Sequence, residues 1–317
     1  MDLPQRLRQA VEEALEHTPR ADLAKASEML SSGYRSETKD GQFHLSDDLA
    51  AQAYLATRLP ATYAAVSACL VAIARVKPDF APKSLLDIGS GTGTVIWAAS
   101  EQWASLEQAT LLEGIPTIRI WGEKLGSPLA QTKWRTADVS TDFEATPSDL
   151  VSAAYVLNEL GDKARATVIE RLWELTKDTL LIVEPGTPAG WERILSVRTK
   201  LINAGGYVIA PCPHHEMCPL IAPDWCHFSQ RVARSRLHRQ AKGAEVGWED
   251  EKYSYVAVSR TPGIQVQARV LGTPRGRSGL VRLKLCKQDG TAKEQTISKR
   301  DGELFKTARR VDWGDTL

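Results

Sequence analysis

The chain has 317 residues, of which 43% are hydrophobic and 25% charged, and its net charge is +1. This length and balance are typical of a soluble globular protein with room for one large domain and a small appendage. The sequence contains no run of eighteen or more apolar residues, so we predict no membrane span and no membrane partner.

The small net charge conceals an uneven distribution along the chain. Residues 231–317 hold 19 Lys and Arg against 10 Asp and Glu, whereas residues 1–230 hold 21 against 29. A basic C-terminal end of this kind favours contact with a polyanion. The N-terminus, M-D-L-P-Q-R-L, has no apolar h-region, and its early acids argue against a mitochondrial presequence. We expect a bacterial cytoplasmic protein, or a mitochondrial matrix protein if the chain is already processed.

Two secondary-structure patterns follow each other along the chain. Residues 1–80 place apolar side chains at helical spacing, as in L-R-Q-A-V-E-E-A-L, and predict an N-terminal helical cap. From Ser84 onward, short apolar strands alternate with helices, which is typical of a parallel sheet covered on both faces. Seven strands are expected, at 84–88, 109–113, 132–137, 149–154, 179–184, 206–210 and 253–259.

These elements predict an α/β fold built on a doubly wound, seven-stranded, Rossmann-like sheet. We expect it to occupy residues 81–262, with a cysteine-rich insertion at 211–248. After Pro262 the segments I-Q-V-Q-A-R-V-L and L-V-R-L-K-L alternate with period two around turn residues. Residues 263–317 are therefore predicted to form a small basic β appendage.

A glycine-rich turn follows the first expected strand, in L-L-D-I-G-S-G-T-G at 85–93. Gly89, Gly91 and Gly93 would let the backbone turn tightly and approach a ligand beside the positive end of a helix. The dinucleotide fingerprint G-x-G-x-x-G fails here, because Thr94 occupies the place of its third glycine.

Polar side chains stand where a methyltransferase fold has its cofactor contacts. Asp87 and the glycine spacing, with Ser90 inside the turn, resemble the loop of class I S-adenosylmethionine-dependent methyltransferases. Glu113 ends the second strand, in a position to accept hydrogen bonds from ribose hydroxyls, and Asp138 follows the third, where an acid usually contacts the adenine amine. Asn158, in N-E-L-G, stands where amino-group methyltransferases often carry N-P-P-Y. We predict an S-adenosylmethionine site, with a degenerate site as the alternative, and we identify no catalytic residue.

Four of the five cysteines fall in the last third of the chain, at Cys212, Cys218, Cys226 and Cys286. Without an export signal we expect a reducing compartment, where disulfides are rare, so metal ligation is favoured. Four thiolates can hold one tetrahedral metal ion or one iron–sulfur cluster. Their spacing leaves zinc and an iron–sulfur cluster equally open. Cys69 lies in an apolar helical run and is predicted to be a buried small hydrophobe.

Five segments together carry a family resemblance that covers most of residues 45–290. They are Y-L-A-T-R-L-P-A-T-Y-A-A, the glycine turn, V-E-P-G-T-P, A-P-C-P-H-H-E-M-C-P-L and D-W-C-H-F-S-Q-R-V-A-R. With these the chain resembles the methyltransferase-like proteins that act on the small ribosomal subunit in mitochondria and bacteria. The resemblance implies an S-adenosylmethionine pocket at the residues above and a [4Fe–4S] cluster, rather than zinc, on the four cysteines. It also implies association with ribosomal RNA (rRNA) during small-subunit assembly.

Basic residues near the C-terminus agree with an RNA partner. The segment at 228–242, F-S-Q-R-V-A-R-S-R-L-H-R-Q-A-K, predicts a helix. Arginine side chains bind phosphates bidentately, and the alternative is a solvated face with salt bridges. The candidate RNA-binding residues are Arg231, Arg234, Arg236, Arg239, Arg282 and Lys284.

Three functional hypotheses follow. In the first, the protein is an rRNA methyltransferase that acts during small-subunit assembly. In the second, it is a non-catalytic RNA-binding assembly module whose cofactor and metal sites serve only folding and docking. In the third, it is a redox-gated switch, in which loss of the cluster frees the appendage and lowers RNA affinity. The resemblance implies no particular methylated nucleotide, so it supports all three.

Overall fold

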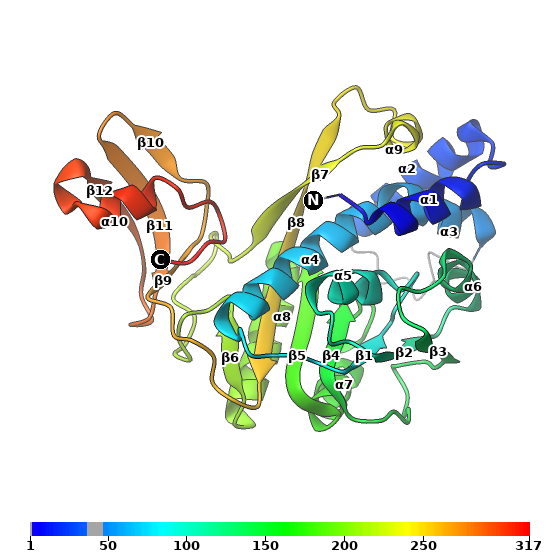
Figure 1. Ribbon diagram of the computed structural model, residues 1–317, viewed down its shortest axis with the longest axis horizontal. Helices are drawn as coiled ribbons and strands as arrows, with labels where there is room; N and C mark the ends of the chain where they lie inside the picture. Colours follow the sequence, from blue (N-terminus) through cyan, green and yellow to red (C-terminus); the bar gives the residue numbers. More distant parts are fainter. Residues whose placement is uncertain (1, 37–46) are drawn as a thin grey trace. The chain divides into compact units, whose positions relative to one another are not determined.

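The computed structural model describes residues 2–36 and 47–317 (Figure 1). Its α-helices are α1 (Gln5–Ala14), α2 (Arg20–Ser36), α3 (Asp48–Thr57), α4 (Leu59–Val76), α5 (Thr94–Gln102), α6 (Pro116–Leu125), α7 (Asp162–Glu174), α8 (Pro188–Asn203), α9 (Arg236–Ala241) and α10 (Glu303–Ala308). Its strands are β1 (Ser84–Ile88), β2 (Gln108–Glu113), β3 (Gln131–Thr136), β4 (Ser148–Ala154), β5 (Thr176–Pro185), β6 (Tyr207–Ala210), β7 (Phe228–Ala233), β8 (Trp248–Ser259), β9 (Ala268–Val270), β10 (Arg275–Arg277), β11 (Leu280–Lys287) and β12 (Ala292–Ser298).

Strands β1 to β8 form one mixed sheet in the order β3-β2-β1-β4-β5-β8-β6, with β7 paired to β8. Strand β1 runs parallel to β2 and β4, and β2 runs parallel to β3, whereas β6 and β8 are antiparallel. Every residue of β1 is buried, as expected for a strand covered on both faces. All seven expected strands are present, and the predicted class I methyltransferase fold is confirmed.

The segment after the third cysteine differs from the prediction. Phe228–Ala233 forms strand β7, and helix α9 covers only Arg236–Ala241, so the helix predicted over 228–242 is wrong in its first half. Phe228 and Val232 are buried, and their spacing of four residues suits a helix. Pairing with β8 overrides that local preference, and the sheet gains an eighth strand.

The chain divides into two compact units. The first contains the chain up to residue 71, residues 81–180 and residues 230–251, and the second contains residues 72–80, 181–229 and 252–317. In the first unit, α9 packs against α2 and α3, which are distant in sequence (Figure 1). The first unit is therefore completed by a segment from late in the chain, residues 230–251.

Helix α4 is, within the described ranges, the one helix that is long and apolar enough to cross a membrane by length and composition. From the sequence, no membrane span is predicted for this segment. Of its eighteen residues, 67% are buried inside the protein. Such burial is what a core helix shows, because its apolar side chains already contact other side chains.

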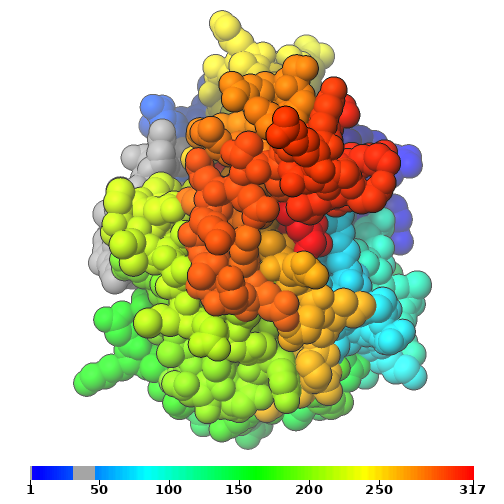
Figure 2. All heavy atoms as spheres, turned by 90° about the vertical axis from the view of Figure 1, so that its left-hand side faces the viewer, coloured from blue at the N-terminus to red at the C-terminus, as the bar shows by residue number. Residues whose placement is uncertain are grey.

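The second unit ends in a four-stranded antiparallel sheet formed by β9 to β12, which the sequence predicted as a β appendage. Val281, Leu283 and Leu285 alternate along β11 and are buried. They pack with Ile297 of β12 and Phe305 of α10 to form a separate apolar core. Figure 2 shows this sheet, in orange to red, beside the yellow-green chain that precedes β7 in the same unit.

Candidate cofactor, metal and nucleic-acid sites

A tight turn joins β1 to α5, as predicted. Gly89, Gly91 and Gly93 have φ angles of 57°, 55° and 76°, which side-chain-bearing residues rarely adopt. A Cβ atom on Gly89 would lie 2.5 Å from Cγ2 of Val156. Beside Gly91 the space is open, and the nearest atom to such a Cβ would be the Tyr54 hydroxyl at 3.9 Å. The turn therefore leaves room for a ligand next to the N-terminus of α5.

Two of the predicted carboxylates lie beside this turn. Glu113, at the end of β2, accepts hydrogen bonds from the backbone N–H groups of Gly91 at 2.7 Å and Ile115 at 2.8 Å. Asp87 is buried, and its Oδ1 accepts a hydrogen bond from Oγ of Ser152 at 2.6 Å. Oδ2 of Asp87 has no partner among the residues that the structure describes. Burial raises the pKa of Asp87 to about 7 and raises the pKa of Glu113 above its ordinary value.

The remaining predicted contacts follow β1, β3 and β4. Oγ of Ser90 donates a hydrogen bond to the carbonyl of Asp87 at 2.8 Å and so stabilises the turn. The exposed Asp138 accepts hydrogen bonds from the backbone N–H and Oγ of Ser140 at 2.9 and 2.6 Å. Oδ1 of Asn158 is buried and has no hydrogen-bond partner within the described ranges. A buried acceptor in this state is costly unless a ligand satisfies it.

These side chains share one edge of the sheet. They follow the carboxyl ends of β1, β2, β3 and β4, and the strand order reverses between β1 and β4. In open α/β sheets, ligands bind outside the carboxyl ends of the strands at such a reversal. The predicted residues are therefore brought to the place where a doubly wound fold binds its ligand.

Two aromatic side chains at this edge, Tyr54 and Trp134, were not predicted from the sequence. The Tyr54 hydroxyl lies 3.5 Å from Oγ1 of Thr62, and burial raises the pKa of this phenol. Cβ atoms on Gly93 and Gly122 would lie 3.2 and 2.6 Å from the Trp134 ring, so both glycines make room for the indole. Helical spacing placed Tyr54 on a helix, but no local signal indicated that its hydroxyl reaches the glycine turn.

The four predicted metal ligands all belong to the second unit and line one cavity of about 30 Å³. Cys212 follows β6, Cys218 and Cys226 lie in the loop that leads to β7, and Cys286 is on β11. None of these thiols is in a disulfide. Apolar side chains form the cavity wall, among them Trp191, Leu220 and Leu271.

The arrangement of these cysteines bears on which metal centre they fit. Within residues 2–36 and 47–317, no group of three His, Cys, Asp or Glu side chains is arranged to hold a single metal ion. A tetrahedral zinc site, with Zn–S bonds of about 2.3 Å, would bring its thiolates to about 4 Å from one another. The four thiols instead line one small cavity. Four thiolates are a donor set that an iron–sulfur cluster takes.

Burial in this cavity favours the neutral form of three thiols, those of Cys218, Cys226 and Cys286. Burial, followed by the neighbouring cysteines, raises the pKa of Cys286 to about 12 and the pKa of Cys226 well above its ordinary value. The pKa of Cys218 is raised by burial in the same way. Because metal ligands must be thiolates, binding of a metal centre here would displace the protons of these thiols.

Two buried arginines line the same cavity. Nη2 of Arg198 donates hydrogen bonds to the carbonyls of His214 and Glu216 at 2.8 and 2.7 Å. Nε of Arg269 donates to the carbonyl of Pro211 at 2.8 Å. Arg198 and Arg269 are only 3% and 2% exposed, so both guanidinium groups are removed from water.

Each of these guanidinium groups retains an unsatisfied N–H. Nε of Arg198 and Nη2 of Arg269 have no hydrogen-bond partner in the described part of the chain. Buried cations without counter-ions are strongly unfavourable. Four thiolates around a [4Fe–4S] core of charge 2+ would carry two net negative charges, which balance the two arginines. Nε2 of His214 lies 3.3 Å from Sγ of Cys286 and is placed to hydrogen-bond that sulfur.

The predicted RNA-binding arginines after Cys226 do not share one helical face. Arg231 is on β7, where it makes hydrogen bonds of 2.9 and 3.1 Å to Asp250 and stacks 3.7 Å from the centroid of the Trp248 ring. Of the predicted residues, Arg236 and Arg239 lie on α9, and both are exposed. On β11, Arg282 pairs with Glu294 at 3.8 Å, and Lys284 pairs with Asp224.

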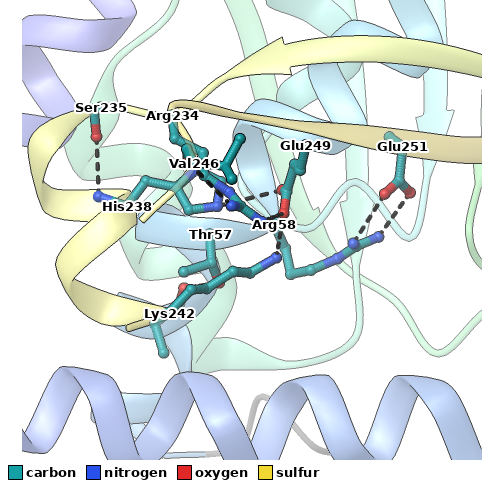
Figure 3. Close-up of polar contacts among 10 residues, drawn as sticks. Thr57, Arg58, Arg234, Ser235, His238, Lys242, Val246, Glu249 and Glu251 are labelled. Carbon is teal, nitrogen blue, oxygen red and sulfur yellow. Dashed lines mark hydrogen bonds and ion pairs between the residues drawn. The ribbon is translucent and has the colours of Figure 1, made fainter. Parts of the chain in front are cut away.

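Arg234 belongs to a half-buried network centred on Glu249 (Figure 3). Oε2 of Glu249 accepts hydrogen bonds from Arg234 at 3.0 Å and Lys242 at 2.8 Å. Burial opposes ionisation of Glu249, but His238 and Lys242 outweigh burial and hold its pKa well below the ordinary value. Arg234 therefore stabilises the segment between β7 and β8, rather than facing solvent.

A second ion pair lies beside this network (Figure 3). Arg58 donates hydrogen bonds of 3.1 and 2.9 Å to the two carboxylate oxygens of Glu251. The hydroxyl of Tyr155 donates to Oε1 of the same carboxylate at 3.0 Å. Tyr155 directly follows β4 and has a φ of 61°, a strained value for a bulky residue. The strand end that leads to Asn158 is thus fixed by the phenol of Tyr155.

Together, the doubly wound sheet, the glycine turn and the acids at the sheet reversal define a protein of the class I methyltransferase fold. More particularly, the chain belongs to the family described as mitochondrial small ribosomal subunit Rsm22, whose model matches residues 48–317. The predicted relation to methyltransferase-like proteins of small-subunit assembly is confirmed at the level of the family.

The chain is similar to several named proteins. It is 31% identical over 285 residues to the human mitochondrial ribosome assembly protein METTL17, an alignment that covers 83% of this chain and 61% of the relative. It is 23% identical over 359 residues to the mitochondrial Rsm22-cox11 tandem protein 2 of Schizosaccharomyces pombe, covering 93% of this chain and 46% of that protein. This chain therefore spans only part of both relatives' lengths. The solved magnesium protoporphyrin IX methyltransferase of Synechocystis, with bound SAH, is 12% identical with a TM-score of 0.41, covering 74% of this chain and 94% of that one.

Proposed function

We propose that this chain is a small ribosomal subunit assembly factor that binds S-adenosylmethionine and rRNA and carries a structural [4Fe–4S] cluster. Membership of the family supports the assembly role, because the description of the family names the small ribosomal subunit. The observation that carries the cluster is the cavity itself, in which four free thiols and two partnerless guanidinium N–H groups meet.

Three features support the cofactor part of the proposal. The glycine turn is open beside Gly91, Glu113 lies next to it, and Asn158 offers an unsatisfied acceptor. We assign Glu113 to the ribose hydroxyls and Asp138 to the adenine amine. When bound, S-adenosylmethionine would supply an electrophilic methyl group, and the protein's part in a transfer would be to hold an acceptor in line with it.

A non-catalytic assembly module is the second candidate, and it is favoured by the positions of the five cysteines and of Tyr155. Four cysteines line the separate metal cavity and Cys69 is buried, so none of the five is available as a nucleophile for cytosine methylation. The phenol of Tyr155 already donates a hydrogen bond to the carboxylate of Glu251. Under this alternative, cofactor and cluster would serve folding and docking alone.

The cluster is tested by anaerobic purification, a visible absorption spectrum and analysis for iron, sulfide and zinc. We expect about four irons per chain and a broad absorption band at about 400 nm. Cys286→Ser should lose both, whereas Cys69→Ala, which removes the thiol outside the cavity, should keep both. A colourless wild-type protein with one zinc would contradict the cluster.

The cofactor is tested by calorimetric titration with S-adenosylmethionine. The wild-type protein should bind it, and Gly91→Arg should not, because the new side chain would fill the space beside the turn. Labelled methyl transfer to immature small subunits would then separate the two candidates. Transfer supports the enzyme, whereas cofactor binding without transfer to any RNA or protein supports the module.

The compartment follows from the source of the chain. Both relatives named above are mitochondrial proteins by name. For this chain, the mitochondrial matrix and the bacterial cytoplasm both stay predictions. Fractionation of source cells, followed by immunodetection of the full-length chain, distinguishes them.

A further inference from the structure

A polar groove runs beside strand β10 and helix α10 in the C-terminal sheet, and Figure 2 shows the face of the molecule that carries these elements. Its volume is about 540 Å³. Arg277, Lys299 and Arg309 line it, and none of the described residues that line it is acidic. Gly276 and Gly279 also line it and have no side chains, so a ligand backbone can approach closely there.

The groove cations differ from the cations that the sequence suggested. Arg231, Arg234 and Arg282 each face a carboxylate in the folded protein. Arg277 and Lys299, in contrast, have no carboxylate partner within the described ranges. An anionic polymer would have to displace an acid from the paired residues, but it can contact the groove cations directly.

The strand next to the groove adds a second, independent observation. Arg275 lies directly opposite Arg282 in the antiparallel ladder between β10 and β11. Like charges in this position repel each other across the strands. The Glu294 carboxylate is 3.8 Å from Arg282, and both side chains are more than half exposed, so it compensates the repulsion weakly. An anion bound along β10 would relieve the repulsion.

We propose that this groove binds the phosphate backbone of RNA through Arg277, Lys299 and Arg309. The proposal rests on the rRNA association proposed above and assigns a surface to it. Phe305 is the one aromatic residue that lines the groove within the described chain, and it is buried, so it cannot stack on bases. Contacts to phosphates alone carry no sequence information. The groove therefore positions RNA without selecting its sequence.

The test compares RNA binding over a range of salt concentrations, using the full chain, an in-vitro transcript of small-subunit rRNA and poly(U). The variant combines Arg277→Gln, Lys299→Gln and Arg309→Gln. The matched control combines Arg75→Gln, Arg171→Gln and Lys306→Gln, three cations that pair with acids on the protein surface. Both triple variants therefore lose the same charge.

We expect the slope of log affinity against log salt to fall by about 2 to 3 in the groove variant and to be unchanged in the control. Between 50 and 200 mM salt, the wild-type protein should lose about 16- to 64-fold more affinity than the groove variant, with both RNAs. A wild-type slope in the groove variant, or an effect on one RNA only, would overturn the phosphate groove and leave rRNA binding intact. A wild-type protein that binds neither RNA would overturn both proposals.

Discussion

Arg269 of β9 ties the C-terminal sheet to the cysteine loop, because its Nε donates a hydrogen bond to the carbonyl of Pro211, the residue before Cys212. The same guanidinium lines the cavity and leaves Nη2 without a partner among the described residues. One side chain therefore both holds the loop that carries Cys212 and places a positive charge beside it.

Arg269→Gln should make the cluster harder to reduce. Reduction adds a negative charge, and at an effective dielectric constant of about 20 a cation about 6 Å away is worth on the order of 100 mV. An anaerobic redox titration followed by electron paramagnetic resonance measures the midpoint potential. Arg269→Lys, which keeps the charge, and the surface change Lys306→Gln should stay near wild type. An unaltered potential in Arg269→Gln, with the cluster retained, would refute the electrostatic role.

The protonation of Asp87 should shape the stability of the cofactor-free protein. Its pKa rises from 3.8 to about 7 on folding, so its contribution to stability is complete below about pH 4 and is lost as the pH rises toward 7. Asp87→Asn should remove this loss, which amounts to at most about 4 kcal/mol above pH 8. Urea unfolding of both proteins from pH 4.5 to 8 measures it. Parallel pH profiles would show that Asp87 does not titrate in this range.

Glu249 should have the opposite pH dependence, because its pKa is lowered from 4.5 on folding. Its contribution to stability is present above about pH 4.5 and disappears as the pH falls. Glu249→Gln should lower the free energy of unfolding at pH 7 by about 2 to 3 kcal/mol, since Arg234 and Lys242 lose their counter-ion. The exposed Glu294→Gln is the control and should cost less than about 0.5 kcal/mol. Equal losses in both variants would contradict a special role for the network.

The arginines of the α9 region should separate RNA binding from stability. Arg236 and Arg239 are exposed, so replacing both by Gln should weaken rRNA binding and lower its salt slope by about 1 to 2, with an unchanged melting temperature. Arg234→Gln should instead lower the melting temperature, because Arg234 pairs with the half-buried Glu249. Thermal melts and filter binding of an rRNA transcript measure the two properties. A stable Arg234→Gln protein with lost RNA binding would reverse this assignment.

Much of the sheet and the glycine turn could be predicted from sequence because their signals are local. Each strand is a short apolar run, and the glycine turn needs positive φ at positions that only glycine adopts easily. The four cysteines were also recognisable, since thiols in a reducing compartment have few other uses. Those signals do not show which residues come together, so the single cavity that the four cysteines line appears only in the fold.

The features that were missed all depend on partners far away in the chain. Strand β7 forms because β8 is available to pair with it, although its own residues have helical spacing. Arg198 and Arg269 look like ordinary surface arginines until folding buries them beside the cysteines. Arg231 and Arg282 were predicted to bind RNA, but in the folded protein each pairs with a carboxylate. The groove cations Arg277, Lys299 and Arg309 were not among the RNA-binding residues predicted from the sequence.

The packing of α9 on α2 and α3 has a consequence for how the protein is made. The N-terminal helices emerge during synthesis long before residues 230–251, which the same compact unit needs. The nascent chain must therefore wait with part of its apolar surface exposed, and Cys286 is translated later still. A chain truncated before α9 would lack these contacts and leave the matching surfaces of α2 and α3 exposed, so the first unit is complete only after residue 251 has been made.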